Sequence, residues 1–231
     1  MQIGTQKHLC SRSVIIISCL FSALLLLGCD QQEAQRQAED APLVRRYSGT
    51  IIAAGDSLTA GLGVMEEEAW PALLEKKLHN NGYQWQVINA GISGETSSGL
   101  LSRIKWILAR KPEIVIVETG GNDALRGIPP AVIHENIARV VQMLQEENVT
   151  VVLAGMQIVQ NLGAKYASEF ADIYPSIARA QESILIPFLL LDVAGEPSRN
   201  QADTIHPDKE GHEIIAETVY PYVLQAMQAH P

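Results

Sequence analysis

The chain has 231 residues, a hydrophobic share of 47% and a formal net charge of −9. This length suits one well-buried core and is short for two, and the composition argues against wholesale disorder. Because the charge is strongly negative, nucleic acid and anionic membrane surfaces are unfavourable partners for the folded body, and we expect it to bind neither.

The first 28 residues have the pattern of a bacterial lipoprotein signal peptide. Lys7 and Arg12 precede the apolar run 14–27, which is shorter than the roughly 20 residues of a membrane-spanning helix but typical of a secretory signal. The run closes with Leu26-Leu27-Gly28-Cys29. This tetrapeptide resembles a lipobox, where a cysteine is alkylated by a diacylglyceryl group and becomes the first residue of the mature chain. An ordinary secretory peptide with a chance cysteine, or an uncleaved anchor, is the alternative.

Lipidation at Cys29 sets the domain organisation that we predict: a signal peptide (1–28), the lipidated cysteine with a polar tether (29–48), and one folded domain (49–231). Cleavage before Cys29 removes Cys10 and Cys19, the other two cysteines, so the mature domain has no disulfide and no cysteine nucleophile. The stretch 30–40 contains no large apolar residue and favours a solvated tether, with a short polar helix as the alternative. We therefore expect a protein of the bacterial cell envelope, held to a membrane by its N-terminal lipid and facing the periplasm or the exterior.

From Thr50 onward, apolar runs typical of buried strands alternate with segments of helical spacing. This alternation predicts an α/β domain with a parallel sheet covered on both faces. Pro187 places the last strand close to a sheet edge, and Pro221 predicts a kink in the last helix. The expected strands are 50–54, 85–88, 114–117, 149–153 and 185–191, and the expected helices are 69–79, 100–108, 132–144, 167–180 and 210–227. Five strands with intervening helices make one three-layer α/β/α domain.

Four short motifs follow the predicted strands, at the edge where open parallel sheets bind their ligands. They are Gly55-Asp56-Ser57-Leu58 after the first strand, Gly91 after the second, Gly120-Gly121-Asn122-Asp123 after the third and Asp203-Thr204-Ile205-His206 after the fifth. Each motif alone is weak evidence. Together they supply a nucleophile, a base, a carboxylate that orients the base, and oxyanion donors, which is the set that acyl transfer requires.

The spacing of these residues suggests how they act together. Asp203 and His206 are three residues apart on one loop, near enough for the carboxylate to reach the imidazole, whose other nitrogen then takes the proton from Ser57. Gly91 lets the backbone approach a substrate closely, and Asn122 offers an amide donor without adding charge.

The four motifs in this order resemble the SGNH, or GDSL, hydrolase superfamily. The segments 89–97 and 117–127 are similar to its bacterial multifunctional thioesterase/arylesterase/lysophospholipase branch, and the resemblance covers about residues 50–223. It implies a flavodoxin-like fold with strand order 2-1-3-4-5. It also implies a serine esterase that hydrolyses aryl and acyl esters, and thioesters or lysophospholipids, through an acyl-serine intermediate.

Carried over residue by residue, the resemblance implies Ser57 as nucleophile, His206 as base and Asp203 as its orienting partner. The oxyanion hole would consist of the backbone amides of Ser57 and Gly91 and the side chain of Asn122. No metal and no organic cofactor is implied, and we expect a monomer whose partner is a small acyl ester or thioester. The segment 156–165 replaces the more proline-marked substrate loop of the best-known relatives, so the acyl preference stays open.

Other serines, acidic residues and histidines could fill the same roles. Ser93, Ser97 and Ser98 compete with Ser57 but are better suited to ordering their own loop. Asp192 and Asp208 compete with Asp203, and Asp56 and Asp123 are expected to bond loop backbone. His79, His134 and His212 fall on predicted helices, where packing or solvation is the default. Two other functions remain: a carbohydrate or peptidoglycan O-acetylesterase on the same scaffold, and a non-catalytic periplasmic binding lipoprotein.

Overall fold

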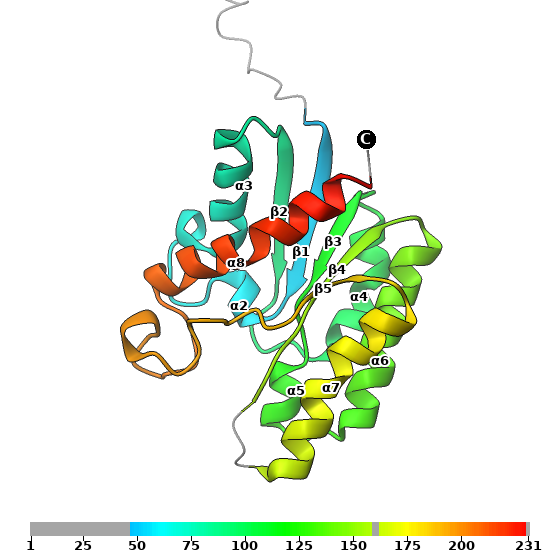
Figure 1. Cartoon of the computed structure of the whole chain (residues 1–231), viewed down its shortest axis with the longest axis vertical. Helices are drawn as coiled ribbons and strands as arrows, with labels where there is room; N and C mark the ends of the chain where they lie inside the picture. Colours follow the sequence, from blue (N-terminus) through cyan, green and yellow to red (C-terminus); the bar gives the residue numbers. More distant parts are fainter. Residues whose placement is uncertain (1–46, 159–161, 230–231) are drawn as a thin grey trace, which may run out of the picture. The chain divides into compact units, whose positions relative to one another are not determined.

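Five parallel strands form the centre of the fold, in the order β2-β1-β3-β4-β5 (Figure 1). The computed structural model describes residues 47–158 and 162–229, so Cys29, the signal peptide and most of the predicted tether lie outside the described residues. The strands are β1 (Gly49–Gly55), β2 (Trp85–Gly91), β3 (Ile114–Val117), β4 (Thr150–Ala154) and β5 (Ile184–Ile186). The predicted α/β class, the five-stranded parallel sheet and the flavodoxin-like strand order are confirmed.

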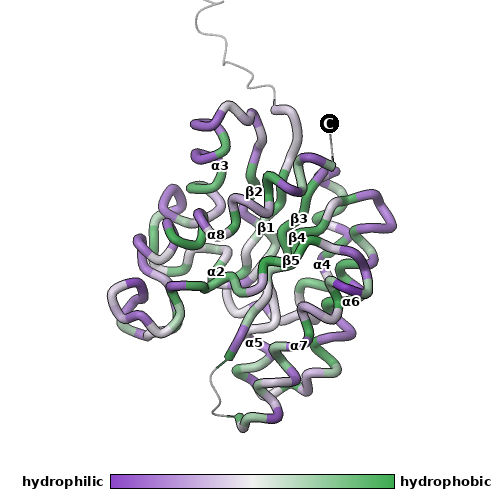
Figure 2. Tube along the Cα trace, in the orientation of Figure 1, coloured by the Kyte–Doolittle hydropathy of each residue, from purple (hydrophilic) through white to green (hydrophobic). Residues whose placement is uncertain are grey.

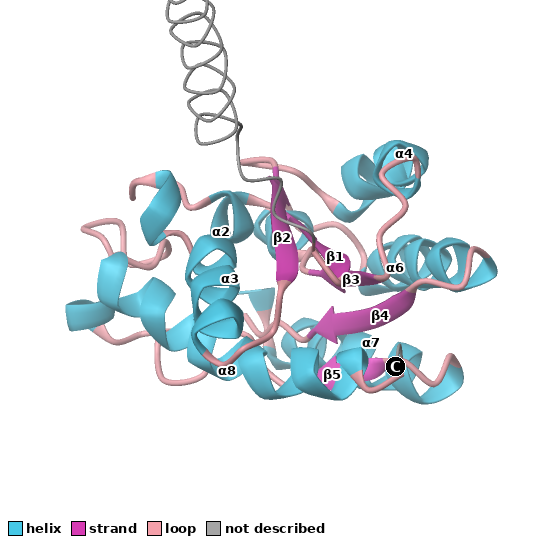
Figure 3. Ribbon diagram, turned by 90° about the horizontal axis from the view of Figure 1, so that it is seen from above, coloured by secondary structure: helices cyan, strands magenta, loops and turns pink. Residues whose placement is uncertain are grey.

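Helices cover both faces of the sheet, because each crossover between parallel strands returns through a helix. On one face α3 packs against α8, and on the other α4 packs against α6 and α6 against α7 (Figures 1 and 3). The long helices are α3 (Trp70–Asn80), α4 (Ser97–Leu108), α6 (Pro130–Glu146), α7 (Ala164–Ala180) and α8 (Lys209–Met227), and the short ones are α2 (Ser57–Ala60) and α5 (Gly121–Leu125). Single 3-10 turns are formed by Glu66–Glu68 and Pro197–Arg199.

The core lies where the three central strands meet the two helical layers. Every residue of β3 is buried, and the apolar colouring of Figure 2 concentrates on this part of the sheet. The β-branched run Ile114–Val117 therefore has no solvent-facing side, as a doubly covered parallel strand requires. None of the helices in the described ranges is long and apolar enough to cross a membrane.

Two predicted strands end three or more residues away from where the structure ends them. The fifth was expected to run from 185 to 191, but β5 ends at Ile186 because Pro187 has no N–H to continue the ladder. Leu189 and Leu190 are buried in the turn that follows, whereas Leu191 is exposed. The second was expected to close before Asn89, but β2 continues to Gly91, which pairs with Gly55 of β1. The edge position expected for β5 is confirmed, and α8 continues as one helix through Pro221.

Candidate active site

The turn between β1 and α2 presents Ser57 at the carboxyl end of the central strand. Asp56 caps α2, since its Oδ1 accepts a hydrogen bond of 3.0 Å from the backbone N–H of Leu58. Ser57 is the first residue of that helix and is 8% exposed. A helix of four residues leaves the first amides without intrahelical acceptors, so the Ser57 N–H stays available at the site.

His206 joins Ser57 to Asp203. Its Nε2 lies 2.9 Å from the Ser57 Oγ, and its Nδ1 lies 2.6 Å from the Asp203 Oδ2. A carboxylate only accepts hydrogen bonds, so the Nδ1–H donates to Asp203 and Nε2 is left to accept from the serine hydroxyl. The three predicted residues are thus connected in the order that proton transfer from serine requires, although Ser57 and His206 are 149 positions apart.

The loop that carries His206 is held in place by its own carboxylate. The Asp203 Oδ1 accepts from the backbone amides of Ile205 (2.9 Å) and His206 (3.0 Å). The hydrogen bond from the His206 amide, followed by those from the His206 side chain and the Ile205 amide, lowers the pKa of Asp203 to about 2. Asp203 therefore stays ionised at any pH at which an imidazole is neutral, and it can stabilise the imidazolium that forms when Ser57 loses its proton.

Asn122 reaches the nucleophile turn from α5. Its Nδ2 donates to the Asp56 Oδ2 at 2.9 Å, which leaves the second N–H of the amide for another acceptor. Gly120, with φ 105°, lets the chain turn into α5, since a Cβ there would lie 2.6 Å from the hydroxyl of Tyr174. The predicted oxyanion donor Asn122 is thus held beside the nucleophile turn by its bond to Asp56 and makes no direct bond to Ser57.

Gly91 lies against the same turn, but its amide is already engaged. The Gly91 N–H donates to the side-chain oxygen of Asn89 at 2.9 Å. A Cβ at this position would lie 2.2 Å from the backbone N of Ala60, so glycine is needed for β2 to pack against α2. The N–H of Gly94, in the loop that follows, has no acceptor among the described residues.

Two residues that the sequence did not point to hold the loops of the site in place. Arg103 of α4 donates to both carboxylate oxygens of Glu95 (2.7 and 2.6 Å) and to the carbonyl of Ala90 (2.8 Å), and so clamps the loop after β2. Glu118, directly after β3, accepts from the Asp56 N–H and the Thr59 hydroxyl, each at 2.9 Å. The sequence shows that Glu118 is a charged residue after a buried strand, but it does not show its partners Asp56 and Thr59, which lie about 60 positions earlier in the chain.

The rival candidates have other roles. Ser97 donates its hydroxyl and its amide to Asp123, and Asp208 caps α8 by accepting from the Gly211 amide. Ser93 is exposed on the loop after β2. His212 is buried and accepts a hydrogen bond at Nδ1 from the Trp70 amide. Asp56 bonds backbone as expected, but it also binds the side chain of Asn122.

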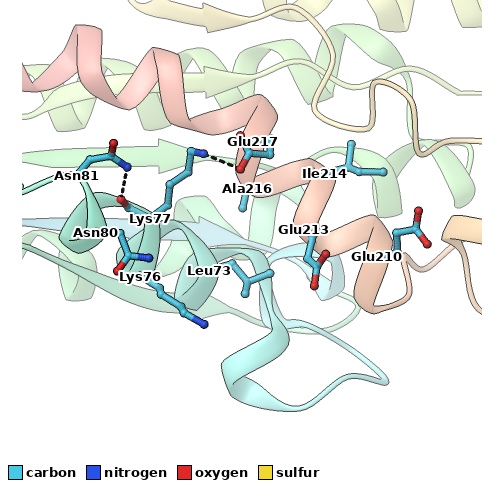
Figure 4. A pocket seen from close by; sticks show the side chains of 10 residues that line it. All are labelled: Leu73, Lys76, Lys77, Asn80, Asn81, Glu210, Glu213, Ile214, Ala216 and Glu217. Atoms are coloured by element: carbon cyan, nitrogen blue, oxygen red, sulfur yellow. Dashed lines mark hydrogen bonds and ion pairs between the residues drawn. The ribbon is translucent and has the colours of Figure 1, made fainter.

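A groove on the surface between α3 and α8 offers no comparable chemistry. Figure 4 shows that both charged and apolar side chains line it, with the ion pair between Lys77 and Glu217 (2.6 Å) across it. It contains none of the residues around Ser57. Nor does any cluster of His, Cys, Asp and Glu within the described ranges have the make-up of a metal site.

A serine hydroxyl, an imidazole and a carboxylate, connected in this order beside amide donors at the carboxyl edge of a parallel sheet, define the class of serine hydrolases. Comparison with known proteins gives the family. The model of the GDSL-like Lipase/Acylhydrolase family matches residues 53–214, and the chain belongs to that family.

Named relatives agree with this assignment. Esterase TesA from Pseudomonas aeruginosa is 39% identical over 200 residues, which are 86% of this chain and 96% of that protein. Thioesterase 1/protease 1/lysophospholipase L1 from Escherichia coli K12 is 36% identical over 169 residues, 73% of this chain and 80% of that protein. Among solved structures, psychrotrophic esterase EstA from Pseudoalteromonas sp., inhibited by monoethylphosphonate, matches with a TM-score of 0.75 and 33% identity, covering 78% of this chain and 100% of that one.

Proposed function

We propose that this carboxylic ester hydrolase cleaves aryl and acyl esters, and also thioesters or lysophospholipids, through an acyl intermediate on Ser57. The observation that carries the proposal is the 2.9 Å contact between the Ser57 Oγ and the His206 Nε2, with Asp203 bonded to the other imidazole nitrogen. The range of substrates is suggested by the relatives, which are named as an esterase, an arylesterase and a thioesterase/lysophospholipase.

The reaction follows from this arrangement. The Ser57 oxygen attacks the acyl carbon while its proton passes to the His206 Nε2, and the carbonyl oxygen becomes an oxyanion. His206 returns the proton to the leaving alcohol or thiol, and the acyl group stays on Ser57. Water then attacks the acyl carbon, gives a proton to His206 and releases the acid, after which the Ser57 oxygen regains the proton.

The oxyanion is stabilised by N–H groups that point at it before the reaction starts. We assign this role to the Ser57 amide, the free N–H of the Asn122 side chain and the Gly91 amide. The Gly91 amide must share or leave its bond to Asn89 to reach a substrate. A crystal structure of the phosphonate-inhibited enzyme tests this assignment, because each donor will lie about 3 Å from the phosphonyl oxygen.

The function is tested with purified protein on p-nitrophenyl acetate and decanoate, an acyl-CoA, lysophosphatidylcholine and acetylated xylan. We expect turnover of the p-nitrophenyl esters, with kcat falling about 10⁴- to 10⁶-fold in Ser57→Ala. Ser98→Ala, an exposed serine of α4, is the matched control and should retain the activity. Turnover of acetylated xylan alone would indicate an O-acetylesterase, and no turnover of any substrate would indicate a binding protein.

We also propose that the enzyme is anchored in the cell envelope by lipid on Cys29 and works as a monomer. The support is the apolar run 14–27 closed by Leu-Leu-Gly-Cys, with no cysteine after it. One acyl chain binds a bilayer only weakly, with a constant on the order of 10⁴ M⁻¹, whereas two anchor stably. Cell fractionation and mass spectrometry of the mature N-terminus, with Cys29→Ser as control, test the anchor. A soluble wild-type protein with an unmodified Cys29 contradicts it and leaves the esterase proposal intact.

A further inference from the structure

Glu118 is a buried carboxyl group whose position the reaction itself does not explain. It follows β3, is 0% exposed, and its Oε2 accepts hydrogen bonds from the Asp56 N–H and the Thr59 hydroxyl. These two residues lie on either side of the nucleophile, one before and two after Ser57. One oxygen of Glu118 therefore holds both sides of the turn that presents the serine.

The second oxygen of Glu118 has no partner among the described residues, and a second carboxyl group lies close by. Asp56 accepts from the Leu58 amide with one oxygen and from the Asn122 amide with the other. Two negative charges in one buried site are strongly unfavourable, so the pair is expected to retain a proton. Asp56 accepts hydrogen bonds with both of its oxygens, whereas Glu118 accepts with Oε2 alone and has Oε1 left for a proton, which favours Glu118 as the protonated member.

The electrostatics of the pair agree with this geometry. Burial, and then the charge of Asp56, raise the pKa of Glu118 well above its usual range. Burial also raises the pKa of Asp56, but the hydrogen bonds from the Leu58 amide and the Asn122 side chain, the nearby carboxyl group of Glu118 and the charge of His206 oppose that rise. A neutral Glu118 beside an ionised Asp56 keeps these four hydrogen bonds and avoids two negative charges in one buried site.

We propose that Glu118 is a positioning residue, whose carboxyl group holds Asp56 in place and so fixes the direction of the Asn122 amide. Asn122 spends one N–H on Asp56, so the direction of that bond determines where its other N–H points. If Asp56 turns away, the oxyanion loses a donor although Ser57, His206 and Asp203 are all intact. The inference rests on the proposed acyl transfer at Ser57.

The first test is a pair of substitutions at position 118, assayed on p-nitrophenyl butyrate. Glu118→Gln keeps a neutral side chain with one acceptor oxygen, and its kcat should stay within about threefold of wild type. Glu118→Leu leaves the Asp56 amide and the Thr59 hydroxyl unpaired. Its kcat should fall about 10- to 100-fold with KM nearly unchanged, less than the roughly 10²- to 10³-fold loss on removing an oxyanion donor itself.

The matched control is Glu113→Leu. Glu113 accepts from the Thr50 amide at 2.6 Å, so it binds the opposite end of β1 with the same kind of bond but lies away from Ser57. A general weakening of β1 would lower the stability of both leucine variants and leave kcat of the folded fraction unchanged in both. Our proposal instead requires a loss of kcat that is specific to Glu118→Leu.

The second test is a double-mutant cycle with Asn122→Ala. If Glu118 acts through Asn122, Glu118→Leu should lower kcat by less than about threefold once Asn122 is already alanine. Should Glu118→Leu not fold, Thr59→Val replaces it. That variant removes one donor to Glu118 and should lower kcat about three- to tenfold only when Asn122 is present.

Three results overturn the proposal: additive losses in the cycle, a Glu118→Gln variant that folds yet is as impaired as the leucine variant, or a leucine variant with wild-type kcat. Failure of the proposed function is a separate result, because it is indicated by activity that survives in Ser57→Ala.

Discussion

The pH dependence of folding stability contains a contribution from His212. This histidine of α8 is 1% exposed, and its Nδ1 accepts a hydrogen bond of 3.3 Å from the Trp70 amide at the start of α3. Burial lowers the pKa of His212 from 6.5 to about 4, the charge of Asp208 opposes that shift, and His206 adds to it. The folded protein therefore holds this side chain neutral at a pH where the unfolded chain protonates it.

The sign and the size of the effect follow from proton linkage. Between pH 6.5 and about 4 the unfolded state binds a proton that the folded state refuses, so the free energy of unfolding decreases as the pH falls through this range. The full loss of unfolding free energy, reached below pH 4, is about 3 kcal/mol, since each unit between the unfolded and folded pKa values of His212 is worth about 1.4 kcal/mol. From pH 7 to pH 5 the same relation gives about 2 kcal/mol.

Urea unfolding of wild type and His212→Asn at pH 7 and pH 5 measures this contribution. Asparagine keeps a side-chain oxygen that can accept from the Trp70 amide but does not titrate. Other groups affect both proteins alike, so wild type should lose about 2 kcal/mol more than the variant between the two values of pH. Equal losses in both proteins would refute the argument that His212 is held neutral in the folded state.

Three further predictions concern the site. Asn122→Ala should lower kcat about 10²- to 10³-fold in steady-state assays, and an unchanged kcat would mean that Asn122 is no oxyanion donor. Gly91→Ala places a Cβ 2.2 Å from the Ala60 nitrogen, so α2 must move; we expect a lower melting temperature and a lower kcat, whereas wild-type values of both would contradict the packing described. The side chains of Arg103 and Glu95 are 14% and 7% exposed, so Arg103→Met leaves a buried Glu95 carboxylate without its partner. We expect the free energy of unfolding in urea to fall by about 3 kcal/mol; a fall of less than about 1 kcal/mol would show that this ion pair contributes little.

Much of the site could be predicted from sequence because its parts follow strand ends. Ser57 follows the end of β1 by two residues and Asn122 follows the end of β3 by five, and parallel strands bring their carboxyl ends to one edge whatever the length of chain between them. Asp203 and His206 share one loop, so their contact depended on local spacing alone. The order of the strands came from the family resemblance, since alternation by itself fixes the class of fold but not the neighbours of each strand.

The supporting contacts could not be predicted in the same way. Glu118 bonds Asp56 only because β3 lies beside β1, and Arg103 of α4 bonds Glu95, which lies in the loop before that helix. The second strand was expected to end at Ile88, with Asn89-Ala90-Gly91 closing it, but pairing with β1 extends β2 to Gly91. In each case a tertiary neighbour, invisible to a local pattern, determined the structure.

The central claim is that Ser57 is the nucleophile activated by His206, and phosphonate labelling followed by peptide mass spectrometry tests it most directly. An alkyl p-nitrophenyl phosphonate should abolish activity as one phosphonyl group per chain is bound, with the adduct on the peptide that contains Ser57. Labelling should be absent in Ser57→Ala and strongly slowed in His206→Ala, since the serine then has no base. An adduct on another serine, such as Ser97, with activity lost in step, would contradict the assignment.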